Sequence, residues 1–351
     1  MRIEARSLRE TRQASIGFSS IVFMPETYFI TGAQGCIGSW VVKALAERGD
    51  IPFVFDRSAD TRRLSAIMES TALQRVRFVI GDITDAAALH TALSNSSARR
   101  IIHLAGLQVP ACQADPATGA LVNVVGTLNV FAAARAQGSE GLVYASSAAV
   151  FGVGEDDAPL DESAVCEPTT HYGVFKRSNE GSARVYFLNH GLSSVGLRPL
   201  TVYGVNRDSG LTSDPTRAMK AAVLGAPFQI RFSGSTDFQY VADTAAAFIA
   251  CADAAPEGAY VFNLHGETVA VAEIARLINE ECKLDLVTVS GPPIPIAPEM
   301  NDAAIRRVIG DLPGTALPTG VRETMRRFSD LRDAGRLDTS DIAAELQQQM
   351  R

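Results

Sequence analysis

Short apolar runs alternate with longer amphipathic stretches through the first 200 residues of the chain. The apolar runs have the length and composition of buried strands, and they lie at 27–31, 52–56, 76–80, 100–105, 141–146 and 193–199. The amphipathic stretches predict helices at 37–48, 60–69, 84–94, 115–137 and 170–190. Strands that alternate with helices form a parallel sheet covered on both faces, with right-handed crossovers. The pattern therefore predicts an α/β fold with a doubly wound, Rossmann-like sheet.

After Arg198-Pro199 the pattern becomes less regular, with helical stretches at 215–225, 241–253, 270–281 and 318–332 and strand-like runs at 228–232, 259–264 and 286–290. We expect four parts: an N-terminal extension (1–24), a dinucleotide-binding domain with the catalytic residues (25–200), a smaller α/β substrate-binding lobe (201–335) and a C-terminal tail (336–351) that is a polar helix or a frayed end. The first 23 residues carry four arginines and two glutamates. Because targeting peptides are poor in acidic residues, we interpret this segment as a loose extension, or Met24 as the natural start.

Composition narrows the class of protein. The net charge is −7 without a long basic run, so a nucleic-acid-binding surface is not indicated. The five cysteines are scattered and contain no C-x-x-C pair, which is typical of free thiols in a reducing compartment, here taken as the cytoplasm, and of a protein without a zinc or other metal site. No apolar stretch approaches the roughly 18 residues of a membrane span, so we expect no membrane insertion.

Three glycines, Gly32, Gly35 and Gly38, separate the first strand from the first helix. A strand that turns directly into a helix directs free N–H groups and the positive end of the helix dipole at one point, which suits an anion. Glycine lets a pyrophosphate approach the backbone and lets the helix pack closely on the sheet. The spacing therefore predicts a dinucleotide site.

Asp56 ends the second strand, where its carboxylate can accept hydrogen bonds from the ribose hydroxyls of an adenosine. A carboxylate there repels a 2′-phosphate and favours NAD over NADP. The neighbouring Arg57, with Arg62 and Arg63, could pair with such a phosphate and weakens the preference. At the end of the third strand, Asp82 could reach the adenine, or Asp82 or Thr84 could cap the next helix.

Tyr172 and Lys176 are four residues apart in a predicted helix and therefore share one face. A tyrosine is a poor base at neutral pH, but a lysine ammonium one turn away stabilises its phenolate. Tyr172 could then take a proton from a substrate alcohol while hydride leaves for a nicotinamide. Ser146 and Ser147 end the fifth strand, where a hydroxyl could orient the substrate oxygen.

As a set, these motifs resemble the extended short-chain dehydrogenase/reductases of the NAD-dependent epimerase/dehydratase family. The matching segments are "TGAQGCIG" (31–38), "GDITD" (81–85), "HLAG" (103–106), "NVVGTLNV" (123–130), "SSAAVFG" (146–152), "YGVFK" (172–176) and "RPLTVYG" (198–204), with a looser likeness to about 330 that includes "FQYVADTAAAF" (238–248). The resemblance implies bound NAD and a catalytic triad of Ser147, Tyr172 and Lys176, with Lys176 also binding the nicotinamide ribose. It also implies a homodimer formed by the helices at 115–137 and 170–190.

The residues expected to bind the cofactor are Gly32, Gly35, Cys36, Ile37, Gly38, Asp56, Arg57, Asp82, Ile83, Leu104, Ala105, Gly106, Asn123, Tyr172, Lys176 and Pro199. Among these, Asn123 is expected to steady the loop after the fourth strand.

Departures from the family pattern narrow the reaction. Dehydratases of nucleotide sugars carry an Asp-Glu pair where this chain has Ala148-Ala149, so a dehydratase is not expected. Nucleotide-sugar epimerases carry an asparagine in place of Thr201 and favour an arginine beside the aspartate at 236–237. Arg207, Arg217 or Arg231 could substitute for these groups.

The leading hypothesis is an NAD-dependent oxidoreductase that acts on a secondary alcohol of a sugar or sugar acid. The alternative is a sugar or nucleotide-sugar epimerase with tightly bound NAD. A third possibility, from another class, is a non-catalytic NAD(P) sensor, but sensors lose the tyrosine or the lysine and both are present here. The sequence does not identify the substrate.

Overall fold

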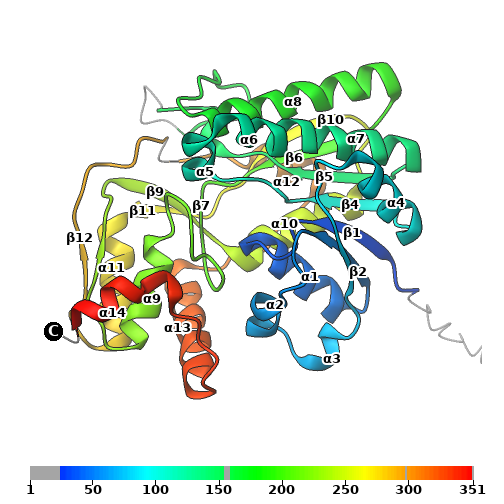
Figure 1. Ribbon diagram of the computed structural model, residues 1–351. Helices are drawn as coiled ribbons and strands as arrows, with labels where there is room; N and C mark the ends of the chain where they lie inside the picture. Colours follow the sequence, from blue (N-terminus) through cyan, green and yellow to red (C-terminus); the bar gives the residue numbers. More distant parts are fainter. Residues whose placement is uncertain (1–23, 154–158, 297–298, 350–351) are drawn as a thin grey trace, which may run out of the picture.

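The computed structural model of the protein describes residues 24–153, 159–296 and 299–349 (Figure 1). Nearly all of the expected N-terminal extension, residues 1–23, lies outside the described residues. The central sheet has seven strands in the order β10-β6-β5-β4-β1-β2-β3, and every neighbouring pair is parallel. The strands are β1 (Thr27–Thr31), β2 (Ile51–Asp56), β3 (Arg77–Ile80), β4 (Arg100–His103), β5 (Gly141–Ala145), β6 (Ser194–Arg198) and β10 (Ala259–Asn263).

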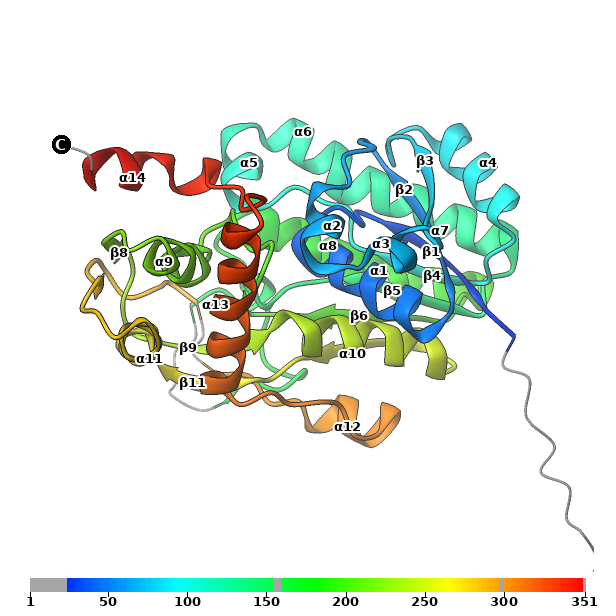
Figure 2. The ribbon, with the colours of Figure 1, turned by 90° about the horizontal axis from the view of Figure 1, so that it is seen from below.

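Helices cover both faces of this sheet (Figures 1 and 2). One face carries α1 (Cys36–Arg48) and α10 (Val241–Ala254), with the short α2 (Arg62–Ile67) and α3 (Ser70–Leu73) beside α1; the other carries α4 (Ala86–Ser96), α7 (Gly126–Gln137) and α8 (His171–His190). Alternate residues of β1 serve the two faces, because Tyr28 and Ile30 belong to one apolar cluster and Phe29 to the other. The doubly wound Rossmann-like fold expected from the pattern is confirmed.

The strand order reverses between β1 and β4, which are neighbours although two strands separate them in the chain. All seven strands are parallel, so their carboxyl ends meet at one edge, and a crevice opens there at the point of reversal. The turn after β1, the loop after β4 and the end of β5 all lie at this edge. The fold therefore brings the glycine turn and the predicted catalytic strand end together.

The segment from 109 to 137 is almost continuously helical. It comprises α5 (Val109–Ala114), α6 (Pro116–Ala120), the π-helical η1 (Leu121–Val125) and α7. By length and composition alone, Pro116–Gln137 could cross a membrane, which the sequence analysis did not anticipate. Within the protein, 44% of its most apolar window is buried.

Residues beyond 200 build most of a second lobe and also complete the central sheet, through β10 and α10. The lobe contains a three-stranded sheet, β11-β9-β7, and a two-stranded sheet, β12-β8. Its elements are β7 (Thr201–Tyr203), α9 (Asp214–Val223), β8 (Phe228–Ile230), β9 (Ser235–Tyr240), β11 (Glu267–Ala270), α11 (Val271–Cys282), β12 (Val287–Val289) and α13 (Leu317–Asp333). The short α12 (Ala303–Ile309) packs against β10 and α10 instead. The expected domain boundary at 200 stays a prediction.

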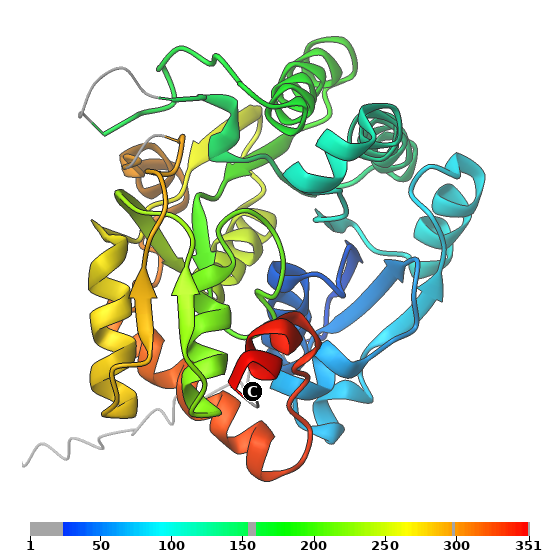
Figure 3. The same ribbon diagram turned by 60° about the vertical axis from the view of Figure 1, so that its left-hand side comes forward.

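The C-terminal tail is ordered through residue 349, as the 3-10 turn η3 (Ser340–Ile342) and α14 (Ala343–Gln349). Lys220 pairs with Asp341 at 2.6 Å and Arg217 with Glu345 at 3.1 Å, which fix the tail to α9. Arg336, the first residue of the tail, donates to the Ser65 carbonyl at 2.6 Å. Figure 3 shows the tail between the second lobe and the β2 side of the central sheet. The tail therefore connects the two parts of the protein.

Candidate active site

The glycine turn joins β1 to α1 at the crevice. Gly32 has φ of +69°, and a side chain there would meet the backbone of Ala105 in the loop after β4. A side chain at Gly38 would overlap the Gly32 carbonyl oxygen. Gly35, the N-cap of α1, offers no side chain to cap the helix, so the first N–H groups stay directed at the crevice. This backbone cradle fits a phosphate group.

One cavity extends from the turn along the end of β2, and we refer to it as the β2-side cavity. Its lining includes Asp56, Arg57, Asp82, Ile83 and Ala105. The Asp56 carboxylate accepts hydrogen bonds from the backbone N–H of Gln34 at 3.1 Å and from that of Arg57 at 2.8 Å. The turn itself therefore orients the carboxylate predicted to bind a ribose.

Asp82 lines the same cavity, and its carboxylate accepts hydrogen bonds from the Thr84 N–H at 2.9 Å and the Thr84 hydroxyl at 2.8 Å. The cap of α4 is Asp85, which accepts from the N–H groups of Ala87 and Ala88. Capping by Asp82 or Thr84, the alternative considered from the sequence, is therefore wrong.

Carboxylates surround the arginines near Asp56. Arg62 pairs with Asp60 at 2.6 Å, and Arg63 is bidentate to Asp208 at 2.7 and 2.9 Å. Asp338, from the C-terminal tail, also lines the cavity. Two of the three arginines that could have favoured a 2′-phosphate thus have carboxylate partners of their own.

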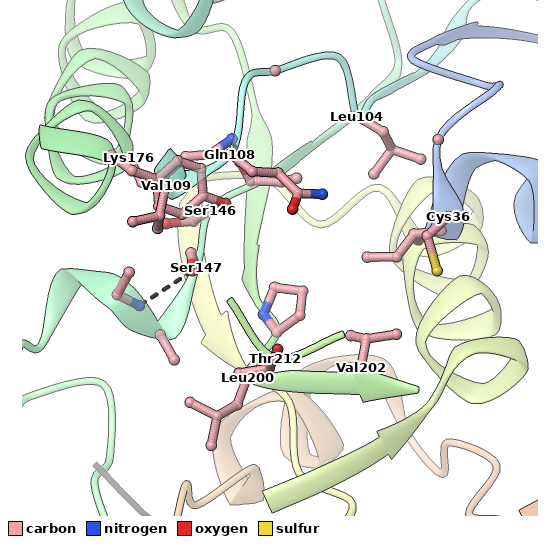
Figure 4. Close-up of a pocket in the computed structure, with 18 of the residues that line it drawn as sticks. Cys36, Leu104, Gln108, Val109, Ser146, Ser147, Lys176, Leu200, Val202 and Thr212 are labelled. Atoms are coloured by element: carbon pink, nitrogen blue, oxygen red, sulfur yellow. Dashed lines mark hydrogen bonds between the residues drawn. The ribbon is translucent and has the colours of Figure 1, made fainter. Parts of the chain in front are cut away.

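A second cavity, the α8-side cavity, runs from the glycine turn to α8. Gly32, Gly35 and Gly38 line it together with Ser147, Tyr172 and Lys176, and Figure 4 shows Ser147, Lys176 and Cys36 around one opening. The two cavities share Gly32, Gly35, Leu104, Gly106 and Leu107. Through these shared residues they form one trough along the carboxyl edge of the sheet.

Tyr172 and Lys176 lie in the first turns of α8, whose N-terminus is capped by Thr170, which accepts from the Gly173 N–H at 3.1 Å. The Lys176 ammonium donates to the Ala145 carbonyl at the end of β5 at 2.7 Å and lies 5.5 Å from the centroid of the Tyr172 ring. Ser147 follows β5, accepts a hydrogen bond from the Ala149 N–H at 3.2 Å and lines the same cavity as Tyr172. The structure thus brings the three predicted catalytic residues together.

Burial dominates the ionisation of this group. It lowers the pKa of Lys176 to about 8. It raises the pKa of Tyr172, while the hydrogen bond with Ser147 and the positive charge of Arg207 act in the opposite direction. The two pKa values therefore move apart, that of Lys176 toward neutrality and that of Tyr172 away from it.

Fifteen of the sixteen residues expected to bind the cofactor line one or both cavities. The exception is Asn123, which is 1% exposed. It accepts from the Leu107 N–H at 2.8 Å and donates to the Leu107 carbonyl at 3.0 Å, so it holds the loop after β4 in place from behind.

Sequence reasoning missed a buried ion pair behind Ser146 and Ser147. Glu180 lies on α8 two turns beyond Tyr172, and its carboxylate accepts from Ser146 at 2.6 Å and from Arg198 at 2.7 and 2.8 Å. Two features of the sequence could have indicated this pair: Glu180 shares a helix face with Tyr172 and Lys176, and Arg198 ends a buried strand.

The positions that differ from nucleotide-sugar epimerases are satisfied internally. The hydroxyls of Thr201 and Thr236 bond to each other at 2.7 Å, and both residues are fully buried. Asp237, also fully buried, accepts from the Gly266 N–H at 2.7 Å and contacts the His265 ring at 3.0 Å. Neither threonine nor Asp237 is among the residues that line the two cavities.

Comparison with known proteins agrees with this architecture. UDP-glucuronate 4-epimerase 6 of Arabidopsis thaliana is 32% identical over 180 residues, which cover 50% of this chain and 39% of that protein. UDP-glucose 4-epimerase of Rhizobium meliloti (strain 1021) is 33% identical over 178 residues, which cover 50% of this chain and 52% of that protein. The chain thus matches about half or less of the length of these two curated relatives.

The crystal structure of UDP-glucose 4-epimerase from Brucella ovis in complex with NAD superposes with a TM-score of 0.75 and 25% identity, covering 87% of this chain and 98% of that one. The family description "NAD dependent epimerase/dehydratase family" matches residues 28–264. This match spans more than half of the chain and confirms the resemblance inferred from the motifs. The chain therefore belongs to the NAD-dependent epimerase/dehydratase family.

Proposed function

We propose that the protein is an NAD-dependent oxidoreductase that interconverts a secondary alcohol and a ketone on a sugar or sugar acid. The observation that carries this proposal is that Tyr172 and Lys176 line the same cavity as the glycine turn. A hydride carrier held by the turn and a proton acceptor on α8 would then face the same substrate carbon.

When bound, NAD supplies the hydride acceptor for this reaction. The N–H groups at the start of α1 would hold its pyrophosphate, Asp56 its adenosine ribose and Lys176 its nicotinamide ribose. Ser147 would hydrogen-bond the substrate oxygen and direct it to Tyr172. Tyr172 would accept the hydroxyl proton, and the Lys176 ammonium would stabilise the resulting phenolate.

The charge around Asp56 supports NAD rather than NADP. A 2′-phosphate would meet the carboxylates of Asp56 and Asp60, whereas the guanidinium of Arg62 is paired with Asp60. The structural neighbour from Brucella ovis carries NAD.

A small polyhydroxylated substrate is favoured over a nucleotide sugar. Arg217 and Arg231, two possible substitutes for the missing diphosphate-binding groups, both pair with Asp214, at 3.1 and 2.5 Å. Neither lines the α8-side cavity. Of the three arginines considered from the sequence, only Arg207 does so.

The relatives named above are 4-epimerases, which favours epimerisation as the second candidate. An epimerase would return the hydride to the other face of the keto intermediate and release no NADH. Incubation of the purified protein with candidate sugars and NAD distinguishes the two. Net absorbance at 340 nm indicates a dehydrogenase, and a new sugar without NADH indicates an epimerase.

The variant Tyr172→Phe tests whether the site is catalytic. It should lose turnover by at least about 100-fold while NAD affinity stays within a few-fold. Turnover that survives the substitution would contradict the proposed role of the phenol, and absence of any turnover in the wild type would favour a cofactor sensor.

We also propose a homodimer formed through α7 and α8. Val174, Val185 and Leu188 are 48%, 52% and 65% exposed along one face of α8, and Leu121 and Val125 are exposed on the neighbouring η1. An apolar face of this kind suits a second copy of the chain. Light scattering should give a dimer that Leu188→Arg dissociates, and a wild-type monomer at micromolar concentration would contradict the proposal.

We also propose roles for the two parts of the chain and a cellular compartment. Residues 25–200 would bind the cofactor and 201–335 would complete the substrate site, since Val202 and Thr212 line the α8-side cavity. The five free cysteines suit the reducing cytoplasm.

A further inference from the structure

Arg207 is a cation in the α8-side cavity whose hydrogen bonding is incomplete. Its Nη2 donates to the Thr212 hydroxyl at 3.0 Å, a neutral acceptor. Its Nε is buried and has no hydrogen-bond partner, and no ion pair of Arg207 occurs among the described residues. Arg207 as a whole is half-buried, so the unsatisfied group is the buried Nε donor, and an anion in the cavity would complete its contacts.

The segment that carries Arg207 is fixed from both sides. Asn206 has a positive φ of 78°, and its amide donates to the Ser39 hydroxyl at 2.9 Å and to the Arg63 carbonyl at 3.1 Å. The Trp40 indole donates to the Val205 carbonyl at 3.0 Å. A left-handed backbone held by three contacts to α1 and α2 sets the direction of the Arg207 side chain before any ligand arrives.

The positive charge of Arg207 affects the pKa values of groups at both ends of the cavity. Burial raises the pKa of Tyr172 and that of Cys36, and the positive charge of Arg207 opposes the rise at both groups. Within the described lining of the α8-side cavity, Arg207 and Lys176 are the cations and no aspartate or glutamate is present. An anionic ligand group would therefore find one guanidinium free to pair with it near the reacting phenol.

We propose that Arg207 binds the carboxylate of the substrate, so that the enzyme acts on sugar acids in preference to neutral sugars. The proposal rests on the oxidoreductase function proposed above and makes its substrate class specific.

Two anions could meet Arg207, the substrate carboxylate and the cofactor pyrophosphate. The pyrophosphate already has the N–H groups of the glycine turn. The neighbours of Arg207 are Gln108 and Thr212, which line the α8-side cavity with Ser147 and are absent from the described lining of the β2-side cavity (Figure 4). Their position favours the substrate.

The test compares acids with neutral partners of the same carbon number. The probes are D-gluconate with D-glucitol, D-galacturonate with D-galactose, and D-erythronate with erythritol. Oxidation is followed at 340 nm, and binding of each probe to the enzyme–NAD complex is measured by calorimetry. The wild type should bind and oxidise at least one acid about 10- to 100-fold better than its partner, the range expected for hydrogen bonds to a charged group.

Arg207→Gln should abolish this preference in the binding measurement, so that each acid binds no better than its neutral partner, while the NAD affinity stays within about twofold. Arg207→Lys should retain part of the preference, because it keeps the charge without the planar fork. The matched control is Arg326→Gln, which removes an arginine whose side chain is 70% exposed on α13 and should change nothing.

The outcomes separate the two proposals. Acids that bind through Arg207 without being oxidised support the carboxylate site and contradict the oxidoreductase. Neutral sugars oxidised as well as acids, or no acid bound better than its partner, overturn the carboxylate site alone. A loss of NAD affinity above tenfold in Arg207→Gln, equal for every probe, assigns Arg207 to the pyrophosphate and also overturns it.

Discussion

The buried pair of Glu180 and Arg198 provides the sharpest test of how the catalytic strand end is held. The side chains are 1% and 2% exposed and are joined by two hydrogen bonds, of 2.7 and 2.8 Å. Glu180→Gln keeps the volume but removes the negative charge, which leaves the guanidinium buried without a compensating partner. Breaking a buried pair in this way costs about 3–5 kcal/mol. That is a large part of the roughly 5–15 kcal/mol by which a folded domain is stable.

Urea denaturation at pH 7, followed by far-UV circular dichroism, measures this loss. For an m-value of roughly 3 kcal/mol/M, a loss of about 4 kcal/mol moves the midpoint down by more than 1 M. The control is Glu140→Gln, since Glu140 is 53% exposed and pairs with Arg99 at the surface. That substitution should change stability by less than about 1 kcal/mol.

A second variant separates the unpaired charge from any disturbance of packing. In Glu180→Leu with Arg198→Met both charges are removed, and most of the lost stability should return. A Glu180→Gln protein as stable as the Glu140→Gln control would refute the reasoning. So would a double variant less stable than the single one.

The pH dependence has a defined sign. Burial raises the pKa of Glu180, but the hydrogen bonds and charge of Arg198, with bonds from Ser146 and Arg177, outweigh it and leave the pKa lowered. A depressed carboxyl pKa stabilises the fold above the unfolded value of about 4.3 and loses this effect as pH falls through the folded value. The stability gap between wild type and Glu180→Gln should therefore narrow below about pH 4.

Three further predictions concern the cofactor and the proton acceptor. The Lys176 ammonium lies 5.5 Å from the centroid of the Tyr172 ring, and at an effective dielectric constant of about 20 a charge at that distance stabilises the phenolate by about 3 kcal/mol, or roughly two pKa units. Lys176→Met should therefore shift the rise of kcat/KM for oxidation upward by about two pH units. An unchanged pH profile would contradict the role of the ammonium. Gly38→Ala should weaken NAD binding by at least about tenfold in a fluorescence titration, because its methyl group would overlap the turn, whereas Gly181→Ala, with no atom within 4 Å of the added carbon, should not. Asp56→Asn should raise the KM for NAD by about tenfold and reduce the preference of the enzyme for NAD over NADP. A variant that prefers NAD as strongly as the wild type does would count against ribose binding by the carboxylate.

The inner strands of the central sheet could be predicted because their apolar runs are buried on both faces. Phe53, Val54 and Phe55, for example, form an uninterrupted buried run in β2. The second lobe was harder to predict from the same signal. In β9 the residues Thr236, Asp237 and Gln239 are polar and yet buried, so neither alternation nor an apolar run marks the strand. Their hydrogen bonds come from segments far away in the chain, which a local pattern does not contain.

The residues of the candidate site also differ in whether they could be predicted from the sequence. The glycine turn, Asp56 and the Tyr172–Lys176 pair could be predicted because each depends on local spacing within one turn, one strand end or one helix face. The roles of Glu180 and Arg207 depend on distant partners. Glu180 gains its role from Arg198 on β6, and Arg207 gains its direction from Ser39 and Arg63 on the opposite side of the crevice.

Lys176 and Arg207, the two cations in the described lining of the α8-side cavity, are supported in related ways, and this has a consequence for specificity. Lys176 is held by the carbonyl of Ala145, on a helix whose next turn is fixed by the buried Glu180. Arg207 follows a left-handed residue tied to α1 and α2. Because both supports exist without a ligand, binding need not order these side chains, and the interaction energy of each charge is available for discrimination. A ligand that lacks the matching anion would leave the buried Nε of Arg207 without a hydrogen-bond partner, so the fold penalises the wrong substrate as well as favouring the right one.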